Sequence, residues 1–205
     1  VDNHPISTNI LNKIKNYIKK QKTDAVIFSD FRHGIFNKTS IPVLTSAIKK
    51  SVFKVADSQV ATRWGNIMDF KSFDLLTPNE KEARFSLADQ DSSISDLTRR
   101  LKEETKLKNL ILKLGERGSF ASGKGYAGGL TIPTFCSKVI DAVGAGDALL
   151  AYSTLAMLAT KSVFIASIIG LAAAACECEH DGNHPVTVDY MHSMLDKVES
   201  RIGYE

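Results

Sequence analysis

Cysteine is scarce in this sequence, with three residues among 205, and an odd number does not build a disulfide framework. That scarcity favours a reducing compartment, so we expect a cytoplasmic protein. The N-terminal residues show no charged segment followed by an apolar core, as a signal peptide would. Long apolar runs are lacking too. The two longest charge-free stretches, residues 148–159 and 162–176, fall short of the roughly 20 residues that cross a bilayer, which predicts two buried helices and no membrane contact.

A strong excess of charge is absent as well. The chain has 26 basic and 23 acidic residues, and a formal net charge of +3 is too small to predict binding to nucleic acid. The lysines between positions 13 and 22 alternate with apolar residues at helical spacing, which is typical of a solvated helix face. With 43% apolar and 24% charged residues, the composition predicts one globular domain over residues 1–205.

Short apolar runs alternate with amphipathic segments along the first half of the chain. Strands are predicted at residues 25–29, 52–56, 73–76, 109–114, 119–122 and 126–132. Helices are predicted at residues 7–21, 40–50, 94–106, 148–159, 162–177 and 188–202, with a short one opening at residues 77–80. This alternation predicts an α/β fold with a mostly parallel sheet, in which ligands bind at the carboxyl ends of the strands.

A glycine-rich turn, Asp-Ala-Val-Gly-Ala-Gly-Asp at residues 141–147, precedes the first charge-free helix. Gly144 and Gly146, with Ala145 between them, leave the backbone uncovered, and the helix that follows presents free N–H groups and a positive dipole end. Together these features predict an anion site. Asp147 stands at its edge, where a carboxylate costs electrostatic energy. A general base acting on a hydroxyl that attacks a phosphoryl group would account for it.

Two other interpretations of this turn stay open. Gly144, Gly146 and Leu149 nearly match the G-x-G-x-x-G fingerprint of dinucleotide-dependent oxidoreductases. However, Leu149 stands where the fingerprint wants a small residue, and no acidic residue ends a second strand about 20 residues on. Alternatively, Asp147 is an ordinary acid in the first turn of a helix. A P-loop is excluded, because the sequence contains no G-x-x-x-x-G-K-[ST].

Residues 141–149 resemble the C-terminal signature D-T-x-G-A-G-D-x-F of the ribokinase-like (PfkB) carbohydrate kinases. The resemblance implies a three-layer fold, with ATP, Mg²⁺ and a sugar or sugar phosphate as ligands. It implies that Asp147 is the catalytic base and that the backbone of residues 144–146 forms the anion hole for the transferred phosphoryl group. It also implies that Asp141 helps to bind a monovalent cation such as K⁺.

This sequence departs from the family signature at three positions. Ala142 replaces the usual Thr, so the hydroxyl that this Thr would bring near the cation site is missing. On the helix that follows, Leu149 replaces Phe and Tyr152 replaces a small residue, which suggests altered packing. The resemblance covers nearly the whole chain but only the C-terminal two-thirds of a family member, so we expect the N-terminal part and the lid to be absent. Family members often pair through that lid, which makes a homodimer an expectation.

Residues 77–82, Thr-Pro-Asn-Glu-Lys-Glu, follow a predicted strand. Asn79 and Glu82 are three apart, so one helical turn places them on one face, where an amide and a carboxylate can hold hydrated Mg²⁺ and a phosphate oxygen. Helix capping is the alternative, with Thr77 as the cap and Glu80 in a capping box. Because the segment resembles the family's T-P-N-x-x-E motif, we favour nucleotide binding by Asn79 and Glu82, with Glu82 reaching Mg²⁺ through water.

Residues 113–118, Lys-Leu-Gly-Glu-Arg-Gly, end a predicted strand and turn through two glycines. A hairpin turn would explain such a string by itself. The segment also resembles the strand-end T-L-G-x-x-G that borders the nucleotide in the family. Lys113 stands where Thr or Ser is common, and a lysine there could contact a phosphate. We therefore predict nucleotide contacts from Lys113, Leu114, Gly115, Glu116, Arg117 and Gly118.

Residues 29–34, Ser-Asp-Phe-Arg-His-Gly, follow the first predicted strand. They resemble the S-D-Y-x-K-G segment of the heptose-phosphate kinase branch of the family. The resemblance implies that Asp30 and His33 reach toward the substrate or the phosphates. Without it, Asp30 is better explained as an acid in a turn.

A Cys-x-Cys followed by two histidines lies within residues 176–184. That spacing is not a strong zinc signature, and Cys176 at the end of an alanine-rich helix is better explained as a buried thiol. In the family, the loop after this helix lines the adenine pocket, which implies nucleotide contacts from Gly182 and Asn183.

The sequence thus favours a kinase that moves the γ-phosphoryl group of ATP to a sugar or sugar-phosphate hydroxyl. The alternative from another class is a nucleotide- or sugar-binding module without catalysis, acting as a regulator. The presence of both Asp147 and the Gly-Ala-Gly turn favours the enzyme.

Overall fold

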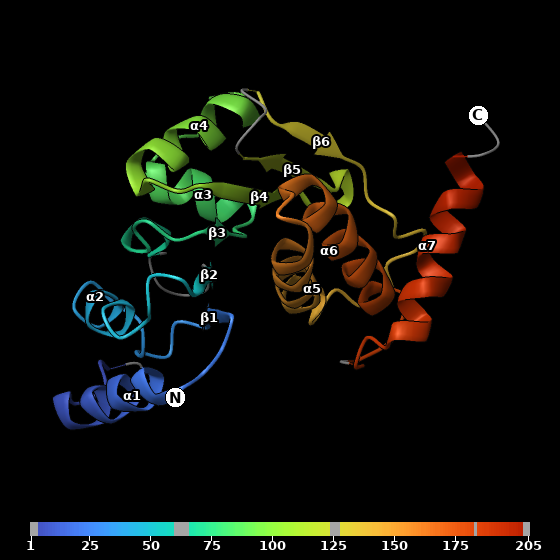
Figure 1. Ribbon diagram of the computed structural model, residues 1–205. Coiled ribbons are helices and arrows are strands. Elements are labelled where there is room, and N and C mark those ends of the chain that lie inside the picture. The colour runs from blue at the N-terminus through green and yellow to red at the C-terminus, as the bar shows by residue number, and fades with distance from the viewer. Residues whose placement is uncertain (1–3, 60–65, 124–127, 183, 203–205) are drawn as a thin grey trace.

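The computed structural model describes residues 4–59, 66–123, 128–182 and 184–202. In that part of the chain, six strands form one sheet in the order in which they occur in the sequence (Figure 1). The strands are β1 (Ala25–Asp30), β2 (Phe53–Ser58), β3 (Leu75–Leu76), β4 (Asn109–Lys113), β5 (Ser119–Ser122) and β6 (Leu130–Ile132). The first four are parallel, while β5 and β6 continue the sheet in antiparallel pairing.

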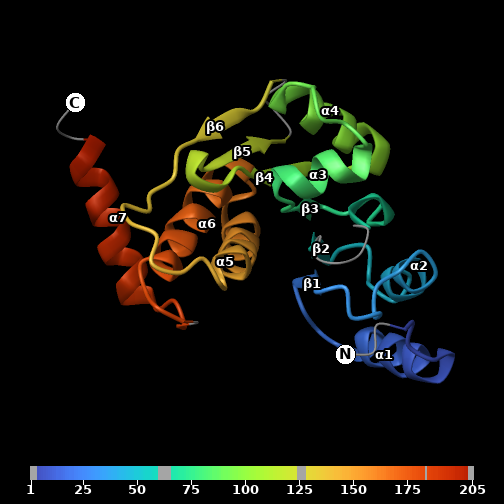
Figure 2. The ribbon, with the colours of Figure 1, turned by 180° about the vertical axis from the view of Figure 1, so that it is seen from behind.

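Helices cover both faces of this sheet, which confirms the three-layer α/β prediction (Figures 1 and 2). One face carries α1 (Thr8–Lys20), α2 (Ser40–Thr45), α3 (Glu80–Leu87) and α4 (Ile94–Thr105). The other face carries α5 (Ala145–Thr160) and α6 (Val163–Cys178), with α7 (Val188–Ile202) packed outside α6. Short 3₁₀ turns occur at Ile67–Asp69 and Gly115–Arg117.

Successive side chains of the parallel strands point to opposite faces of the sheet and so belong to two separate hydrophobic cores. Val55, Leu75 and Ile111 pack against α5 and α6, whereas Ala56 and Leu76 pack on the opposite face. All five are fully buried. A parallel sheet buried on both faces requires such continuous apolar runs, which is why these strands could be predicted from the sequence.

Several predicted boundaries differ from the structure. Helix α2 ends at Thr45 and not near residue 50, because Ala47 and Ile48 donate to carbonyls three residues back and so form turns. Strand β3 is limited to two residues, and α5 begins at Ala145 and not at residue 148. The start of the strand predicted at 126–132 lies outside the described residues, and β6 occupies only its end.

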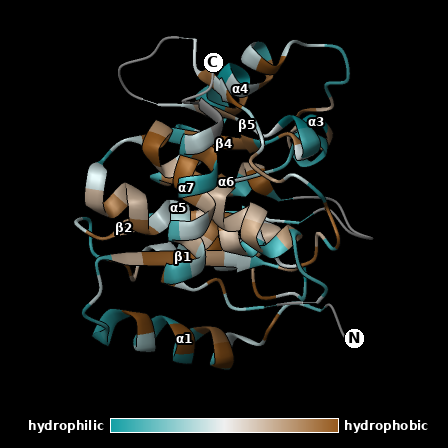
Figure 3. Ribbon diagram, turned by 90° about the vertical axis from the view of Figure 1, so that its right-hand side faces the viewer, coloured by the Kyte–Doolittle hydropathy of each residue, from teal (hydrophilic) through white to brown (hydrophobic). Residues whose placement is uncertain are grey.

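The two charge-free helices α5 and α6 pack closely on each other. Figure 3 shows apolar colouring over much of both helices, whereas α1 alternates between apolar and polar faces. Gly170 of α6 lies against the Ser153 hydroxyl and Leu149 of α5, leaving no room for a Cβ. The Ser153 hydroxyl in turn donates to the Ala166 carbonyl at 3.0 Å. In the described parts of the chain, no helix combines the length and apolarity needed to cross a membrane.

We expect Gly170→Ala to lower the free energy of unfolding by about 1–3 kcal/mol, because the added methyl group overpacks the contact between α5 and α6. Urea denaturation would measure the change. Gly128→Ala is the control, since a Cβ there meets open space. Equal stability of Gly170→Ala and the parent protein would contradict the close approach of the two helices.

Candidate active site

Four polar side chains from distant parts of the sequence meet at the carboxyl edge of the parallel strands. Ser29 lies near the end of β1, Asp57 near the end of β2 and Lys113 at the end of β4. Asp147 joins them from the first turn of α5. The Lys113 ammonium donates to Asp57 Oδ2 at 2.8 Å, while Asp147 lies close enough to Asp57, Lys113 and the Ser29 hydroxyl for each of them to shift its pKa.

The glycine-rich turn places the start of α5 beside this cluster. Gly144 precedes the helix with φ of +86°, a left-handed conformation that favours glycine. Among the described residues no side chain caps this helix start, so its first N–H groups are available to an anion. The Lys113 ammonium lies 3.5 Å from the point where a Cβ on Gly146 would stand. A lysine, a bare backbone and a helix N-terminus therefore surround one small volume.

Asp57 is the functional candidate that sequence reasoning missed. Its side chain is buried; Oδ2 is paired with Lys113, while Oδ1 has no hydrogen-bond partner among the described residues. An orphaned buried carboxylate oxygen is costly and is usually explained by a ligand or ion. The signal was present in the sequence, because an acid that follows an apolar parallel strand lies at the edge where ligands bind.

Asp147 is held in an environment that opposes its charged form. Although it keeps access to solvent, partial burial raises the pKa of the Asp147 carboxyl, and the neighbouring Asp57 carboxylate raises it further. Lys113 and the Ser29 hydroxyl act in the opposite direction without cancelling the rise. A carboxylate with a raised pKa is a stronger base than an ordinary aspartate, as a general base requires.

We expect Asp57→Asn to lower the pKa of Asp147, because the substitution removes a neighbouring negative charge and leaves Lys113 free to favour the ionised form. Carboxyl ¹³C NMR titration would measure the shift, with Asp147→Asn identifying the resonance. Asp74→Asn is the matched control. It removes another buried carboxylate, ion-paired at the opposite end of the strands, and should leave the Asp147 titration unchanged. A rise in the pKa of Asp147 in Asp57→Asn would contradict this electrostatic arrangement.

Asn79 and Glu82 form a capping box at the start of α3. The Asn79 side chain accepts from the Glu82 N–H at 2.8 Å, and Glu82 accepts from the Asn79 N–H at 2.8 Å and its amide group at 2.6 Å. The cap is thus Asn79 and not Thr77, whose hydroxyl is buried without a partner among the described residues. Capping accounts for the spacing of the pair, so their contacts with nucleotide and Mg²⁺ stay predictions.

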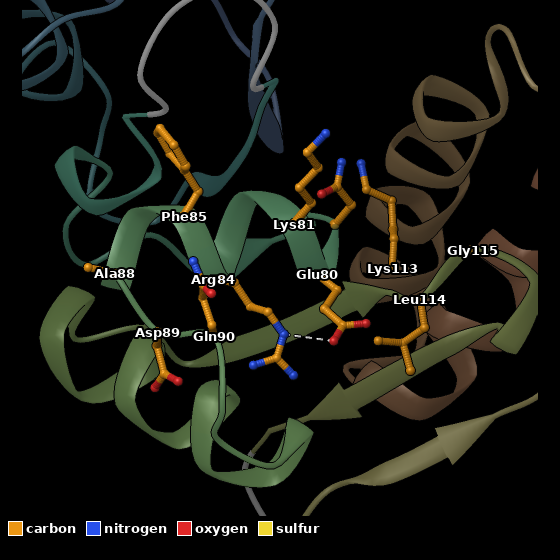
Figure 4. Close-up of a pocket in the computed structure, with 11 residues that line it drawn as sticks. Glu80, Lys81, Arg84, Phe85, Ala88, Asp89, Gln90, Lys113, Leu114 and Gly115 are labelled. Carbon is orange, nitrogen blue, oxygen red and sulfur yellow. Dashed lines mark hydrogen bonds and ion pairs between the residues drawn. The ribbon is translucent and has the colours of Figure 1, made fainter.

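The end of β4 holds this capping box near the lysine. The Lys113 N–H donates to the Pro78 carbonyl at 2.8 Å, and Asn79 forms an isolated parallel bridge with Lys113. The residues predicted from two separate motifs are therefore neighbours in the structure. Figure 4 shows the Lys81 and Lys113 side chains extending in the same direction from α3 and β4.

Two cavities meet at Lys113 and Gly115, which line both. Cavity A, of about 730 Å³, lies over α3 (Figure 4) and is lined by Asn79, Glu80, Lys81, Arg84, Phe85, Ala88, Asp89, Gln90, Lys113, Leu114 and Gly115. Cavity B, of about 700 Å³, lies beside the glycine-rich turn and α6. It is lined by Lys113, Gly115, Glu116, Gly118, Thr134, Cys136, Ser137, Lys138, Val139, Ala142, Ala145, Gly146, Leu149, Leu171, Ala174, Ala175 and Cys178.

Cavity B is the better candidate for a nucleotide, because it joins an apolar wall to the turn that is predicted to bind an anion. Its wall differs from the one predicted. Residues 134–139 and the end of α6 line it, whereas Gly182 does not, and Asn183 lies outside the described residues. Sequence reasoning missed residues 134–139, because this loop, with one lysine and no glycine, matches no motif and has no hydrophobic periodicity of its own.

The segment predicted at 113–118 divides between the two cavities. Glu116 and Gly118 line cavity B, and Leu114 lines cavity A. Arg117 lines neither and instead forms an ion pair with Glu80 of α3. Its predicted contact with the nucleotide is the least supported of this group.

Asp30 is buried in a network formed by Arg32 of its own loop and by Asn66 from a distant segment. One carboxylate oxygen accepts from the Arg32 N–H at 2.7 Å, while the other accepts from the Arg32 guanidinium at 3.0 Å and from the Asn66 amide at 2.8 Å. This geometry matches the alternative interpretation of a turn-forming acid. His33 is exposed on the same loop, and a role for either residue toward substrate stays a prediction.

Asp141 and the cysteine-rich segment were the two other candidates for metal binding. Asp141 Oδ1 accepts from the Val143 N–H at 3.0 Å, which orders the turn, and its role toward a monovalent cation is untested. Cys176 is buried, and its thiol donates to the Tyr190 carbonyl at 3.7 Å. This burial and this bond agree with the interpretation of Cys176 as a buried thiol.

The sequence profile of the pfkB family carbohydrate kinases matches residues 12–187, and the chain belongs to this family. Among curated relatives, the bifunctional protein HldE of Helicobacter pylori strain J99 is 25% identical over 204 residues, covering 97% of this chain and 43% of the relative. HldE of Sulfurimonas denitrificans is 29% identical over 159 residues, covering 75% of this chain and 31% of the relative. The chain spans less than half the length of these relatives.

Solved structures of the family share the fold. Arabidopsis thaliana ribokinase, complexed with ribose and ATP, superposes with a TM-score of 0.68 at 20% identity, covering 95% of this chain and 60% of that one. Phosphofructokinase-2 of Escherichia coli, in complex with potassium, superposes with a TM-score of 0.80 at 16% identity, covering 95% and 64%. At these identities the comparison confirms the ribokinase-like fold.

Proposed function

We propose that this chain carries the nucleotide-binding and catalytic part of an ATP-dependent carbohydrate kinase, with Asp147 as the general base. The observation that carries the proposal is the position of Asp147 on the glycine-rich turn, beside Lys113 and Asp57. Phosphoryl transfer needs little covalent chemistry from a protein and depends on positioning and electrostatic stabilisation. The cluster offers a base for the attacking hydroxyl and positive groups for the transferred phosphoryl oxygens.

Each group has a distinct part in the proposed reaction. The Asp147 carboxylate takes the proton of the sugar hydroxyl as its oxygen attacks the γ-phosphorus of ATP. The N–H groups at the start of α5 and the Lys113 ammonium face the negative charge that spreads over the phosphoryl oxygens. The rest of the nucleotide extends into cavity B, where Leu171, Ala174 and Ala175 of α6 supply an apolar wall.

Mg²⁺ fits the donor set of this cluster. The unpartnered Asp57 Oδ1 is a hard, buried oxygen, and Mg²⁺ bound with a nucleotide needs only one or two carboxylates from the protein. The ion would neutralise phosphate charge during transfer. Asp57 is therefore the stronger candidate to hold it, with Glu82 acting through water, because both Glu82 oxygens already accept from Asn79.

The acceptor is proposed to be a sugar or sugar phosphate, with heptose phosphates first among those to test. The HldE relatives and the resemblance of residues 29–34 to the heptose-phosphate kinase branch support this choice. A binding module without catalysis is the second candidate. The raised pKa of Asp147 favours the enzyme, since a purely binding site gains nothing from a carboxylate beside an anion.

ATP turnover against a panel of sugars and sugar phosphates tests the proposal, using the longest form of the protein that its gene encodes. We expect one acceptor to stimulate ADP formation and Asp147→Ala to reduce kcat by about 100-fold or more, with ATP binding retained. ATP binding without stimulation by any acceptor would favour the binding module. Failure to bind ATP at all would contradict the assignment of residues 141–147.

Lys113→Met tests the phosphate contact separately. A charged hydrogen bond contributes about 1.5–3 kcal/mol, so we expect kcat/KM for ATP to fall by about 10- to 100-fold. The acidic limb of the pH profile should also move to higher pH, because Lys113 no longer lowers the pKa of Asp147. Lys19→Met on the exposed side of α1 is the control. A downward move of the acidic limb would contradict the assignment.

A further inference from the structure

Two of the three cysteines line cavity B. Cys136 belongs to the segment that follows β6, and Cys178 is the last residue of α6. Cys176, two residues earlier on the same helix, faces a different small cavity lined also by His180 and Tyr190. The chain thus places one thiol pair on the proposed nucleotide cavity and a third thiol away from it.

The two thiols are neighbours, close enough for each to influence the pKa of the other. The backbone holds the two segments together as well, because the Ile140 N–H donates to the Cys178 carbonyl at 2.8 Å and the Asp141 N–H donates to it at 3.3 Å. The Ser137 hydroxyl adds a bond to Glu179 at 2.8 Å. Two neighbouring thiols on backbone segments that these bonds hold side by side are well placed to be joined.

We propose that Cys136 and Cys178 form a reversible disulfide in the wall of cavity B, and that this bond weakens nucleotide binding there. The second half of the proposal rests on the proposed function. Joining the sulfurs shortens their separation to about 2.05 Å, which draws residues 134–139 toward α6 and narrows the cavity. The oxidant is a small disulfide such as oxidised glutathione.

The reaction takes two steps of thiol–disulfide exchange. In the first, the Cys136 thiol loses its proton and attacks the small disulfide, releasing one small thiol. Cys178 then loses its proton and attacks the Cys136 sulfur, releasing the second small thiol. The protein loses two hydrogens in total, and one small disulfide becomes two thiols. Because burial raises the pKa of Cys178 to about 11, we expect the reaction to be slow at neutral pH and faster in mild alkali.

The test exposes the full-length protein to oxidised glutathione at about pH 8.5 and maps disulfides by mass spectrometry after digestion. We expect one cross-linked peptide pair that joins Cys136 to Cys178, reversed by dithiothreitol. Cys136→Ser and Cys178→Ser should abolish it. Cys176→Ser should leave it intact, which makes this variant the matched control on the same helix. Absence of the cross-link from protein whose circular dichroism shows it to be folded would overturn the proposal.

The effect of the disulfide on nucleotide binding is measured by titrating ATP into the reduced and oxidised proteins by calorimetry. We expect the dissociation constant for ATP to rise about tenfold on oxidation, equivalent to about 1.4 kcal/mol, and to recover on reduction. A cross-linked protein with unchanged affinity would overturn the effect on nucleotide binding. If the reduced protein binds no ATP, the proposed function and this second half fail together, while disulfide mapping still decides the first half.

Discussion

The ion pair between Lys113 and Asp57 organises the candidate active site. It joins the ends of β4 and β2 across β3, and it places a positive charge next to the backbone of Gly146. Without Lys113, two carboxylates, those of Asp57 and Asp147, would face each other beside the proposed anion site. The lysine thus offsets the charge of Asp57, while Asp147 keeps a raised pKa.

The architecture explains why these residues come together. Parallel strands bring all their carboxyl ends to one edge, so Ser29, Asp57 and Lys113 become neighbours although long stretches of chain separate them. The helix pair on the opposite face then directs the start of α5 at the same edge. That placement depends on the tight contact of Gly170 with Ser153, which fixes α5 on α6.

Sequence reasoning recovered the features that depend on local pattern. Continuous apolar strands, charge-free helices and a glycine-rich turn each leave a signal within about ten residues, and all three are where they were predicted. It was less successful where one residue has two physical uses. Asn79 and Glu82 have the spacing of a ligand pair and equally that of a capping box, and only the structure shows that the capping box is formed. Asp57 carried a usable signal, an acid at the end of an apolar strand, but its pairing with Lys113 depends on the order of the strands in the sheet. The position of residues 134–139 beside α6 is a tertiary contact that no local pattern contains.

The charge balance of the cluster has a further consequence for its chemistry. Counting formal charges, Lys113 offsets only one of the two carboxylates, and a nucleotide brings several more negative charges to the same volume. Added anionic charge raises the pKa of Asp147 further, which would protonate the base and stop proton transfer. The base can remain ionised only if positive charge arrives with the phosphates. The orphaned Asp57 oxygen is a suitable place to receive a cation, so ionisation of the base and loading of a cation-bound nucleotide are expected to be coupled through a single buried carboxylate.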